Sequence, residues 1–221
     1  MSQNTTGTAV DNDVIARYRL LSPCTISDAL ASLGVGRSAL DGIIPAALDA
    51  KVVGPAFTVT CEQASTSTRD RIDYMEDIIP GSVVVVTNDG RVDCSVWGGQ
   101  RTVAARYRGA VGSVVDGAYR DIPEHIAMDY PVFAKARTIV ASQGYSNPVA
   151  MQETIEIGGV SVSPGDLIVG DASGVVVIPA EHIEQALVLS EAITAKESWI
   201  IEQVEAGADY FQAKRDAGGV Q

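Results

Sequence analysis

The sequence has few of the residues that build soft-metal clusters and disulfide frameworks. It contains two histidines and three cysteines among 221 residues, and Cys24, Cys61 and Cys94 form no CxxC pair. A histidine-rich zinc site is therefore not expected, and scattered cysteines in odd number predict reduced, mostly buried thiols in a cytoplasmic protein. A metal held by this chain would be a hard cation, Mg²⁺ or Mn²⁺, bound through carboxylate oxygens and water.

Positive charge and long apolar runs are also scarce. Lys and Arg together number 16 against 28 Asp and Glu, which gives a formal net charge of −12. Such an excess of acid disfavours binding to nucleic acid or to an anionic membrane. No apolar run approaches the ~20 residues of a spanning helix, and the N-terminus lacks the regions of a signal peptide. We expect a mobile tail over residues 1–12 and a single domain over residues 13–221.

The hydrophobic pattern indicates an α/β domain with a mixed sheet, since 46% of the residues are hydrophobic and strand-like and helix-like segments alternate. Residues 82–87 include four consecutive valines, which is typical of a strand buried on both faces. A helix over 96–107 and a second buried strand over 112–115 complete a βαβ unit with parallel strands. Further strands are predicted over 51–61, 131–134, 155–162, 166–169 and 174–179, and further helices over 14–21, from Thr25 or Ser27 to Gly34, 121–128 and 181–206.

The two longest predicted helices carry apolar residues at helical spacing, which predicts a buried stripe on each. In the helix over 96–107 the stripe consists of Val96, Val103, Ala104 and Tyr107. In the C-terminal helix it consists of Ala186, Leu189, Ile193, Ile200 and Val204. Trp97 and Trp199 are expected to be packing residues.

Residues 97–102, WGGQRT, form the first candidate site, at the start of the helix after the valine strand. Gly98 and Gly99 allow the backbone to approach a ligand closely. The free N–H groups of a first helical turn also attract an anion such as a carboxylate. The same two glycines would equally serve a tight strand-to-helix turn that binds no ligand, so both interpretations are open at this point.

Residues 116–121, DGAYRD, form the second candidate site, at the end of the second buried strand. Ligands of open α/β sheets bind near the carboxyl ends of the strands, so both segments are expected at one edge. Arg120 can grip a carboxylate or a carbonyl oxygen, and Asp121 can hold a divalent cation. Together they would stabilise the enolate of a 2-oxo acid. The alternative is a surface ion pair that caps a helix.

The remaining acids and thiols are given structural roles. Asp28, Asp93, Asp166 and Asp171 are expected in caps and turns, and Cys94 has no neighbouring histidine that would make it a nucleophile. The motifs GxxxxGK[ST], GxGxxG after a strand, GxSxG and HExxH are absent. The lack of a glycine-rich nucleotide loop disfavours a methyltransferase.

Six short motifs are typical of one known family in both order and spacing. They are DAL at 28–30, VWGG at 96–99, GSVVDGAYRD at 112–121, PVFA at 131–134, PGD at 164–166 and DASGV at 171–175. In these motifs the chain resembles the family of the 4-hydroxy-4-methyl-2-oxoglutarate and 4-carboxy-4-hydroxy-2-oxoadipate aldolases, which also contains the regulator of ribonuclease activity A. The resemblance covers about residues 14–207.

The resemblance implies a three-layer ββα domain like the swivelling phosphohistidine domains, in a homotrimer or hexamer with active sites between subunits. Its aldolases use Mg²⁺ or Mn²⁺ to cleave a small 4-hydroxy-2-oxo acid to pyruvate, and they also decarboxylate oxaloacetate. By position, Arg120 would bind the pyruvyl oxygen and Asp121 would ligate the metal. The backbone of residues 98–101 would take the pyruvate carboxylate, and Glu197 would reach the metal-bound water of a neighbouring subunit.

The chain departs from the aldolases of this family in the glycine loop. They carry an acid where this chain has Gly99, and apolar residues where it has Gln100 and Arg101. Losing an acid that orders metal-bound water can change a metal site ~10- to 100-fold. Arg101 could instead meet a second carboxylate of the substrate. The alternative to a lyase is a regulator that binds a ribonuclease or another protein, a role that an acidic surface allows.

Overall fold

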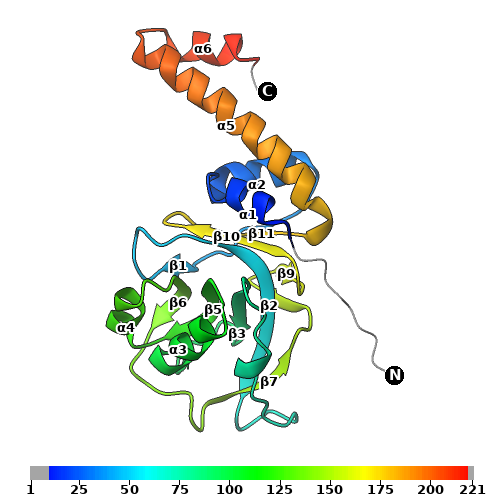
Figure 1. Cartoon of the computed structure of the whole chain (residues 1–221), viewed down its shortest axis with the longest axis vertical. Coiled ribbons are helices and arrows are strands. Elements are labelled where there is room, and N and C mark those ends of the chain that lie inside the picture. Colours follow the sequence, from blue (N-terminus) through cyan, green and yellow to red (C-terminus); the bar gives the residue numbers. More distant parts are fainter. Residues whose placement is uncertain (1–9, 219–221) are drawn as a thin grey trace.

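The fold is built on a large mixed β-sheet that curls almost into a barrel, with helices on two sides (Figure 1). The computed structural model describes residues 10–218. The nine strands of this sheet are β1 (Ile44–Pro45), β2 (Val52–Gln63), β3 (Val83–Thr87), β4 (Ser95–Trp97), β5 (Gly112–Tyr119), β6 (Val132–Arg137), β7 (Ser146–Met151), β10 (Leu167–Asp171) and β11 (Gly174–Ile178). A separate hairpin consists of β8 (Ile155–Ile157) and β9 (Val160–Val162).

The long strand β2 joins the two halves of the sheet. Its residues 52–55 pair antiparallel with β10, and its residues 56–60 pair parallel with β3. Strands β3, β5 and β6 continue the parallel half, while β10 and β11 form an antiparallel pair. The sheet is therefore mixed, as the sequence predicts, and the parallel half carries the candidate site.

The valines of β3 show why this strand lies in the middle of the sheet. Val83 and Val85 pack inside the barrel, whereas Val84 and Val86 pack outward, under the helices that cover the parallel half. All four side chains are 0% exposed. Side chains alternate between the faces of a strand, so a run of four valines requires cover on both faces. The predicted buried strand and its parallel βαβ unit are confirmed.

The helices form two layers outside the sheet. Helices α3 (Gly99–Tyr107) and α4 (Ile122–Ala127) cover the parallel half, and α1 (Asn12–Tyr18), α2 (Pro23–Ser32) and α5 (Ile183–Glu205) cover the antiparallel half (Figure 1). The remaining helical elements are η1 (Met75–Asp77), η2 (Ala180–His182) and α6 (Tyr210–Asp216). Within residues 10–218, no helix combines the length and the apolar character needed to cross a membrane.

Two predicted boundaries in the βαβ unit are wrong, and both lie at the candidate site. The helix predicted over 96–107 begins at Gly99, because the two residues before Gly98 form β4 and pair with β5. Its predicted apolar stripe is also wrong: Val103 is 57% exposed and Tyr107 is 88% exposed, whereas Thr102 is buried. A stripe counted from Val96 includes a residue that belongs to a strand, so the helical phase is misread.

The second wrong boundary is the end of the strand predicted over 112–115. Strand β5 continues to Tyr119, so the predicted turn at Asp116 and Gly117 lies inside the strand. An aspartate is accommodated there because its charge is paired: Asp116 Oδ1 lies 2.9 Å from Lys135 Nζ, and Oδ2 accepts the Gly90 N–H at 2.9 Å. Of the predicted loop, only Arg120 and Asp121 remain outside the strand.

Other elements differ in smaller ways. The N-cap of α2 is Ser22 rather than Thr25 or Ser27, and α1 begins at Asn12, with residues 1–9 of the expected tail outside the described part of the chain. The elements β1, β4, β7 and α6 have no counterpart in the predicted set. The distal half of α5 projects beyond the sheet, so the predicted stripe is not buried there and Trp199 is 38% exposed (Figure 1).

Candidate active site

The two segments predicted to lie at one edge of the sheet do meet in the structure. Strands β4 and β5 run parallel, so the loop after β4 lies beside the end of β5. The Arg120 N–H donates to the Trp97 carbonyl at 3.1 Å. The Gly99 N–H donates to Asp121 Oδ2 at 2.8 Å. The carboxylate of one segment therefore caps the helix of the other, where the positive end of the helix dipole stabilises it.

The two glycines of this loop have different roles in packing. A Cβ atom at Gly98 would lie 2.8 Å from Asp121 Oδ2 and 3.3 Å from Arg120 Cγ, so a larger residue would displace the carboxylate. A Cβ atom at Gly99 would lie 3.5 Å from Asp121 and 3.7 Å from Glu124 Cβ, which is ordinary contact. Gly98 is thus required by the approach of the acid, whereas position 99 has room for a side chain.

Asp121 holds an unusual backbone conformation. Its φ of 61° and ψ of 43° lie in the left-handed region, which few residues other than glycine adopt. The carboxylate does not cap its own helix, α4, but turns toward α3. Arg120 Nε lies 3.5 Å from the same Oδ2 atom, and in the described part of the chain Oδ1 has no hydrogen-bond partner. Such strain is often kept where a side chain must point in one direction.

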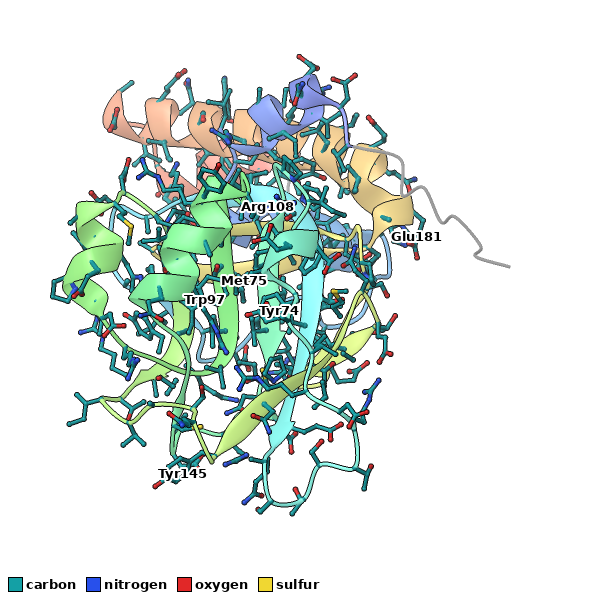
Figure 2. All side chains as sticks on the ribbon, turned by 60° about the horizontal axis from the view of Figure 1, so that its bottom comes forward. Tyr74, Met75, Trp97, Arg108, Tyr145 and Glu181 are labelled. Atoms are coloured by element: carbon teal, nitrogen blue, oxygen red, sulfur yellow. The ribbon has the colours of Figure 1, made fainter. Side chains whose placement is uncertain are left out.

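A buried chain of hydrogen bonds supports the Arg120–Asp121 pair. The Trp97 indole N–H donates to Thr102 Oγ1 at 2.9 Å, Thr102 Oγ1 lies 2.8 Å from His125 Nδ1, and His125 Nε2 lies 2.6 Å from the Arg120 carbonyl oxygen. That carbonyl only accepts, so Nε2 carries the imidazole proton and Nδ1 accepts from the hydroxyl. Figure 2 shows Trp97 inside the molecule beside α3. The chain fixes the backbone from which the Asp121 carboxylate projects.

Lowering the pH is expected to destabilise this arrangement through His125. Burial lowers the pKa of the His125 imidazole below its ordinary value of 6.5. Below pH 6.5 the unfolded chain takes up a proton that the folded chain resists, so the free energy of unfolding falls as the pH falls. His125→Gln should lower that free energy by about 1–3 kcal/mol at pH 7.5, because buried partners lose their bonds.

Chemical unfolding of wild type and His125→Gln at pH 7.5 and 5.5 measures both effects. The variant cannot titrate at this position, so its stability should change less between the two pH values. A variant with the full wild-type pH dependence would show that His125 does not contribute to it.

A cavity of about 460 Å³ opens beside the Arg120–Asp121 pair. Three guanidinium groups and one carboxylate line it, those of Arg71, Arg101, Arg120 and Asp121. The N–H groups of residues 100 and 101 in the first turn of α3 have no partner in residues 10–218. The cavity is thus locally positive in a protein of net charge −12, and it suits a small anion.

The donors at this site fit a hydrated hard cation better than a soft one. Within the described residues, no three His, Cys, Asp or Glu side chains come together as a metal cluster. Mg²⁺ is commonly held by one or two carboxylates, with water and substrate filling its other positions. Asp121 supplies one carboxylate with a free oxygen, and Glu124 lies in the adjacent first turn of α4. These residues would hold Mg²⁺ or Mn²⁺ with most of its water retained.

The structure does not bring Glu197 to the other predicted site residues. Glu197 lies on the exposed distal part of α5, which packs against α1, α2 and α6 on the side away from α3 and α4 (Figure 1). Cys94 and Cys61 are buried, and burial raises the thiol pKa of Cys94 and raises that of Cys61 to about 11. Neither thiol is suited to nucleophilic chemistry. Cys24 is exposed, so two of the three thiols are buried, in agreement with the expectation of mostly buried cysteines.

Several residues at the site carry no signal in the sequence. Thr102 and His125 are isolated polar residues in helical segments, and their buried partnership depends on the packing of α3 against α4. Arg71 lies in an irregular segment, earlier in the chain than the other residues that line the cavity. In the sequence Glu124 is indistinguishable from a solvated helix residue. Only His125 offered a hint, since one of two histidines in the chain lies four residues after Asp121.

Known proteins resemble this chain over most of its length. The family model described as RraA-like (Aldolase/RraA) matches residues 23–177. The "Putative 4-hydroxy-4-methyl-2-oxoglutarate aldolase" of Halalkalibacterium halodurans is 38% identical over 177 residues, covering 79% of this chain and 80% of that protein. Protein DlpA of Legionella pneumophila is 32% identical over 86% of this chain, but the chain spans only 31% of DlpA.

Solved structures share the fold. A crystal structure of an uncharacterized protein from Pseudomonas syringae pv. tomato has a TM-score of 0.85 at 34% identity, covering 94% of this chain and 99% of that one. The structure of Streptomyces coelicolor RraAS2, described as an unusual member of the RNase ES inhibitor RraA protein family, has a TM-score of 0.76 at 29% identity. It covers 90% of this chain and 98% of that one.

Proposed function

Because the chain belongs to the RraA-like family, we propose that it is a divalent-metal-dependent lyase acting on small 2-oxo acids. Its reaction is the cleavage of a 4-hydroxy-2-oxo acid to pyruvate, with decarboxylation of oxaloacetate as a second activity. One observation carries this proposal above the others. Arg120 and the strained Asp121 lie together at the N-terminus of α3, on the wall of a positive cavity.

Each side chain has a defined task in this reaction. The free N–H groups at positions 100 and 101 bind the carboxylate next to the 2-oxo group. As the bond between C3 and C4 breaks, the 4-hydroxyl gives up its proton to water and C4 becomes a carbonyl. The electron pair of the broken bond moves onto the 2-oxo oxygen, where the Arg120 guanidinium faces the growing negative charge, and C3 of the resulting enolate takes a proton from water to give pyruvate. Asp121, with Glu124 nearby, would hold Mg²⁺ or Mn²⁺, which when bound supplies Lewis-acid polarisation of the substrate carbonyl.

The support for Arg120 is geometric. Its backbone is held on both sides, by the Trp97 carbonyl through its N–H and by His125 through its carbonyl. Its side chain is 41% exposed and lines the cavity together with Asp121. A backbone held in this way limits where the guanidinium can lie, and a charge already near the reacting oxygen stabilises the transition state with little reorganisation.

In this function the protein acts as a homotrimer or hexamer, and Glu197 of one copy serves the site of a neighbour. The projection of α5 supports this arrangement, because Glu197 lies far from the site of its own chain (Figure 1). The projecting helices also expose apolar side chains that a neighbouring copy would cover, among them Trp199, Ile201 and Phe211. Isolated exposed apolar residues are common, but a group of large ones marks an interaction surface.

A regulator that binds a protein partner is the second candidate. The likeness to RraAS2 favours it, since that protein is described as belonging to an RNase ES inhibitor family. A purely regulatory protein has no need of a strained carboxylate and an arginine beside an anion-binding cavity. The lyase therefore has the stronger support, since it uses each of these features.

Pyruvate release tests the proposed function directly. Oxaloacetate and 4-hydroxy-4-methyl-2-oxoglutarate are each supplied with Mg²⁺, with Mn²⁺ and with EDTA. Above the rate of an enzyme-free blank with the same metal, we expect pyruvate only with metal, because Asp121 supplies a carboxylate with an unpaired oxygen where a hard cation would bind. An absence of pyruvate from both compounds with either metal would reject the lyase and favour the regulator, for which capture of a partner protein is the next measurement.

A further inference from the structure

We infer that the part of the cavity formed by Arg71 and residues 141–148 is a second anion subsite, in which Arg71 binds the distal carboxylate of a dicarboxylic 2-oxo acid. This inference rests on the proposed function, because it assumes that the 2-oxo end of the acid lies at Arg120. It assigns specificity to a residue far from the Arg120–Asp121 pair in the chain. It also separates two groups of substrate, those with a carboxylate at each end and those with one.

This part of the cavity is a fixed surface. The Ile72 N–H donates to the Pro148 carbonyl at 2.9 Å, which holds the backbone of Arg71 beside β7. The loop before β7 is closed by the Ser146 N–H, which donates to the Ser142 carbonyl at 2.9 Å. The Ser146 hydroxyl in turn donates to the buried Asn88 Oδ1 at 2.7 Å. Arg71 is therefore presented to the cavity by backbone that two other segments hold in place.

Arg71 differs from the other arginines of the cavity in having no acceptor. Arg101 donates to the Val96 carbonyl, and Arg120 lies against Asp121. The nearby Arg69 pairs with Glu153 at 2.9 Å, outside the cavity. In residues 10–218 the Arg71 guanidinium has neither a hydrogen bond nor an ion pair. Although the chain has 28 acidic residues, none of those described pairs with Arg71. The donors of its guanidinium are therefore available to a ligand.

The chemistry of this part of the cavity fits a carboxylate rather than an apolar group. Besides Arg71 it includes the polar residues Ser142, Gln143 and Asn147, and it carries no acidic residue. A guanidinium binds a carboxylate through two parallel bonds, and neighbouring amides can donate to the remaining lone pairs. The volume of about 460 Å³ lies in the lower part of the range for small-ligand cavities. The cavity therefore has room for a short acid with a charge at each end.

Arg101 is the less suitable residue for this role. The sequence suggests it as the partner of a second carboxylate, but it belongs to α3, whose first-turn N–H groups are assigned to the first carboxylate, and it already donates to a backbone carbonyl. A distal carboxylate needs a cation other than those at the 2-oxo end. Arg71 comes from a segment outside α3 and has no such acceptor, so the structure favours Arg71 over Arg101.

Two ligands that differ only at the distal end test the inference. 2-Oxoglutarate and 2-oxopentanoate have the same five-carbon 2-oxo acid skeleton, but only the first has a distal carboxylate. Isothermal titration calorimetry in the presence of Mg²⁺ measures the Kd of each ligand for the full-length protein. We expect wild type to bind 2-oxoglutarate about 10-fold more tightly, in line with one charge-assisted bidentate contact.

Arg71→Ala should remove this preference by weakening 2-oxoglutarate about 10-fold while leaving 2-oxopentanoate unchanged. Arg69→Ala is the matched control, since this arginine lies two residues away and pairs with acids outside the cavity. It should keep the wild-type preference. Arg71→Lys should restore part of it, because the charge remains but the fork is lost.

Three results would overturn the inference: wild type that binds the two ligands equally, wild type that binds neither, and Arg71→Ala that weakens both to the same extent. The test is separate from the proposed lyase activity because it measures binding. A clear preference without any metal-dependent pyruvate release would keep the subsite and reject the lyase. Pyruvate release without a preference for 2-oxoglutarate would keep the lyase and reject the subsite.

Discussion

Asp121→Asn is expected to lower pyruvate release from oxaloacetate at least ~1000-fold at saturating Mg²⁺, equivalent to about 4 kcal/mol of transition-state stabilisation. The substitution removes the carboxylate charge that a hard cation requires. It leaves the shape of the site intact, since an asparagine amide oxygen still accepts the Gly99 N–H. Asparagine also tolerates the left-handed backbone of this position, so the fold should be kept.

Asp129→Asn is the matched control for this experiment. Asp129 is another aspartate with a left-handed backbone, at φ 50°, and it does not line the cavity. It should retain wild-type activity. The measurement is kcat/KM over a series of Mg²⁺ concentrations, with thermal unfolding as a check of the fold. An Asp121→Asn protein that keeps more than a tenth of the activity with an unchanged Mg²⁺ dependence would contradict the assignment of Asp121 as the metal ligand.

Gly98→Ala is expected to lower kcat/KM about 100-fold without unfolding the protein. The added Cβ would lie 2.8 Å from Asp121 Oδ2 and 3.3 Å from Arg120 Cγ, so both side chains must move. A displacement of about 1 Å in a catalytic group can cost this much activity. The backbone itself accepts alanine, because a φ of −166° is extended and open to any residue.

Gly99→Ala separates this steric effect from a general sensitivity of the loop. Its Cβ would meet Asp121 at 3.5 Å and Glu124 at 3.7 Å, which requires no movement. Alanine also favours the first turn of a helix over glycine. Activity should therefore stay within about twofold of wild type. Equal losses in the two variants would show that the approach of Asp121 to Gly98 is not what the loop requires.

The space around Gly99 is relevant to the acid that this chain lacks at position 99. The structure has room for a side chain there, so packing does not force the glycine. Glu124 belongs to α4 rather than to the loop, and it lies next to the space that a side chain at position 99 would occupy. An acidic residue from another element is thus close to position 99, which the local sequence of the loop does not reveal.

Local pattern was sufficient for the central strands and for the family. Four consecutive valines in β3 require two covered faces, and this requirement alone places the strand in the middle of a sheet. Arg120 and Asp121 are neighbours in the chain at the end of a buried strand, so their proximity did not depend on folding. The motif order also identified the family, because it is a property of the sequence itself.

Local pattern failed where an element depends on a partner distant in the chain. Strand β4 exists because Ser95 and Trp97 pair with β5, and Asp116 remains in a strand because Lys135 neutralises it. The helical spacing that began at Val96 carries no information about either contact. The exposed stripe on α5 is a related case, since periodicity indicates an apolar face but not what covers it.

The sequence by itself determined the α/β class, the parallel unit, and the residue types that can bind a carboxylate and a hard cation. Only the tertiary structure decided how they act together. It assigned Gly98 rather than Gly99 to the approach of Asp121, linked Trp97 through Thr102 and His125 to the Arg120 backbone, and brought Arg71 to the cavity that Arg120 lines. The physical reason is that these contacts join strands and helices whose pairing is set by global packing, which the hydrophobic period of each segment does not encode.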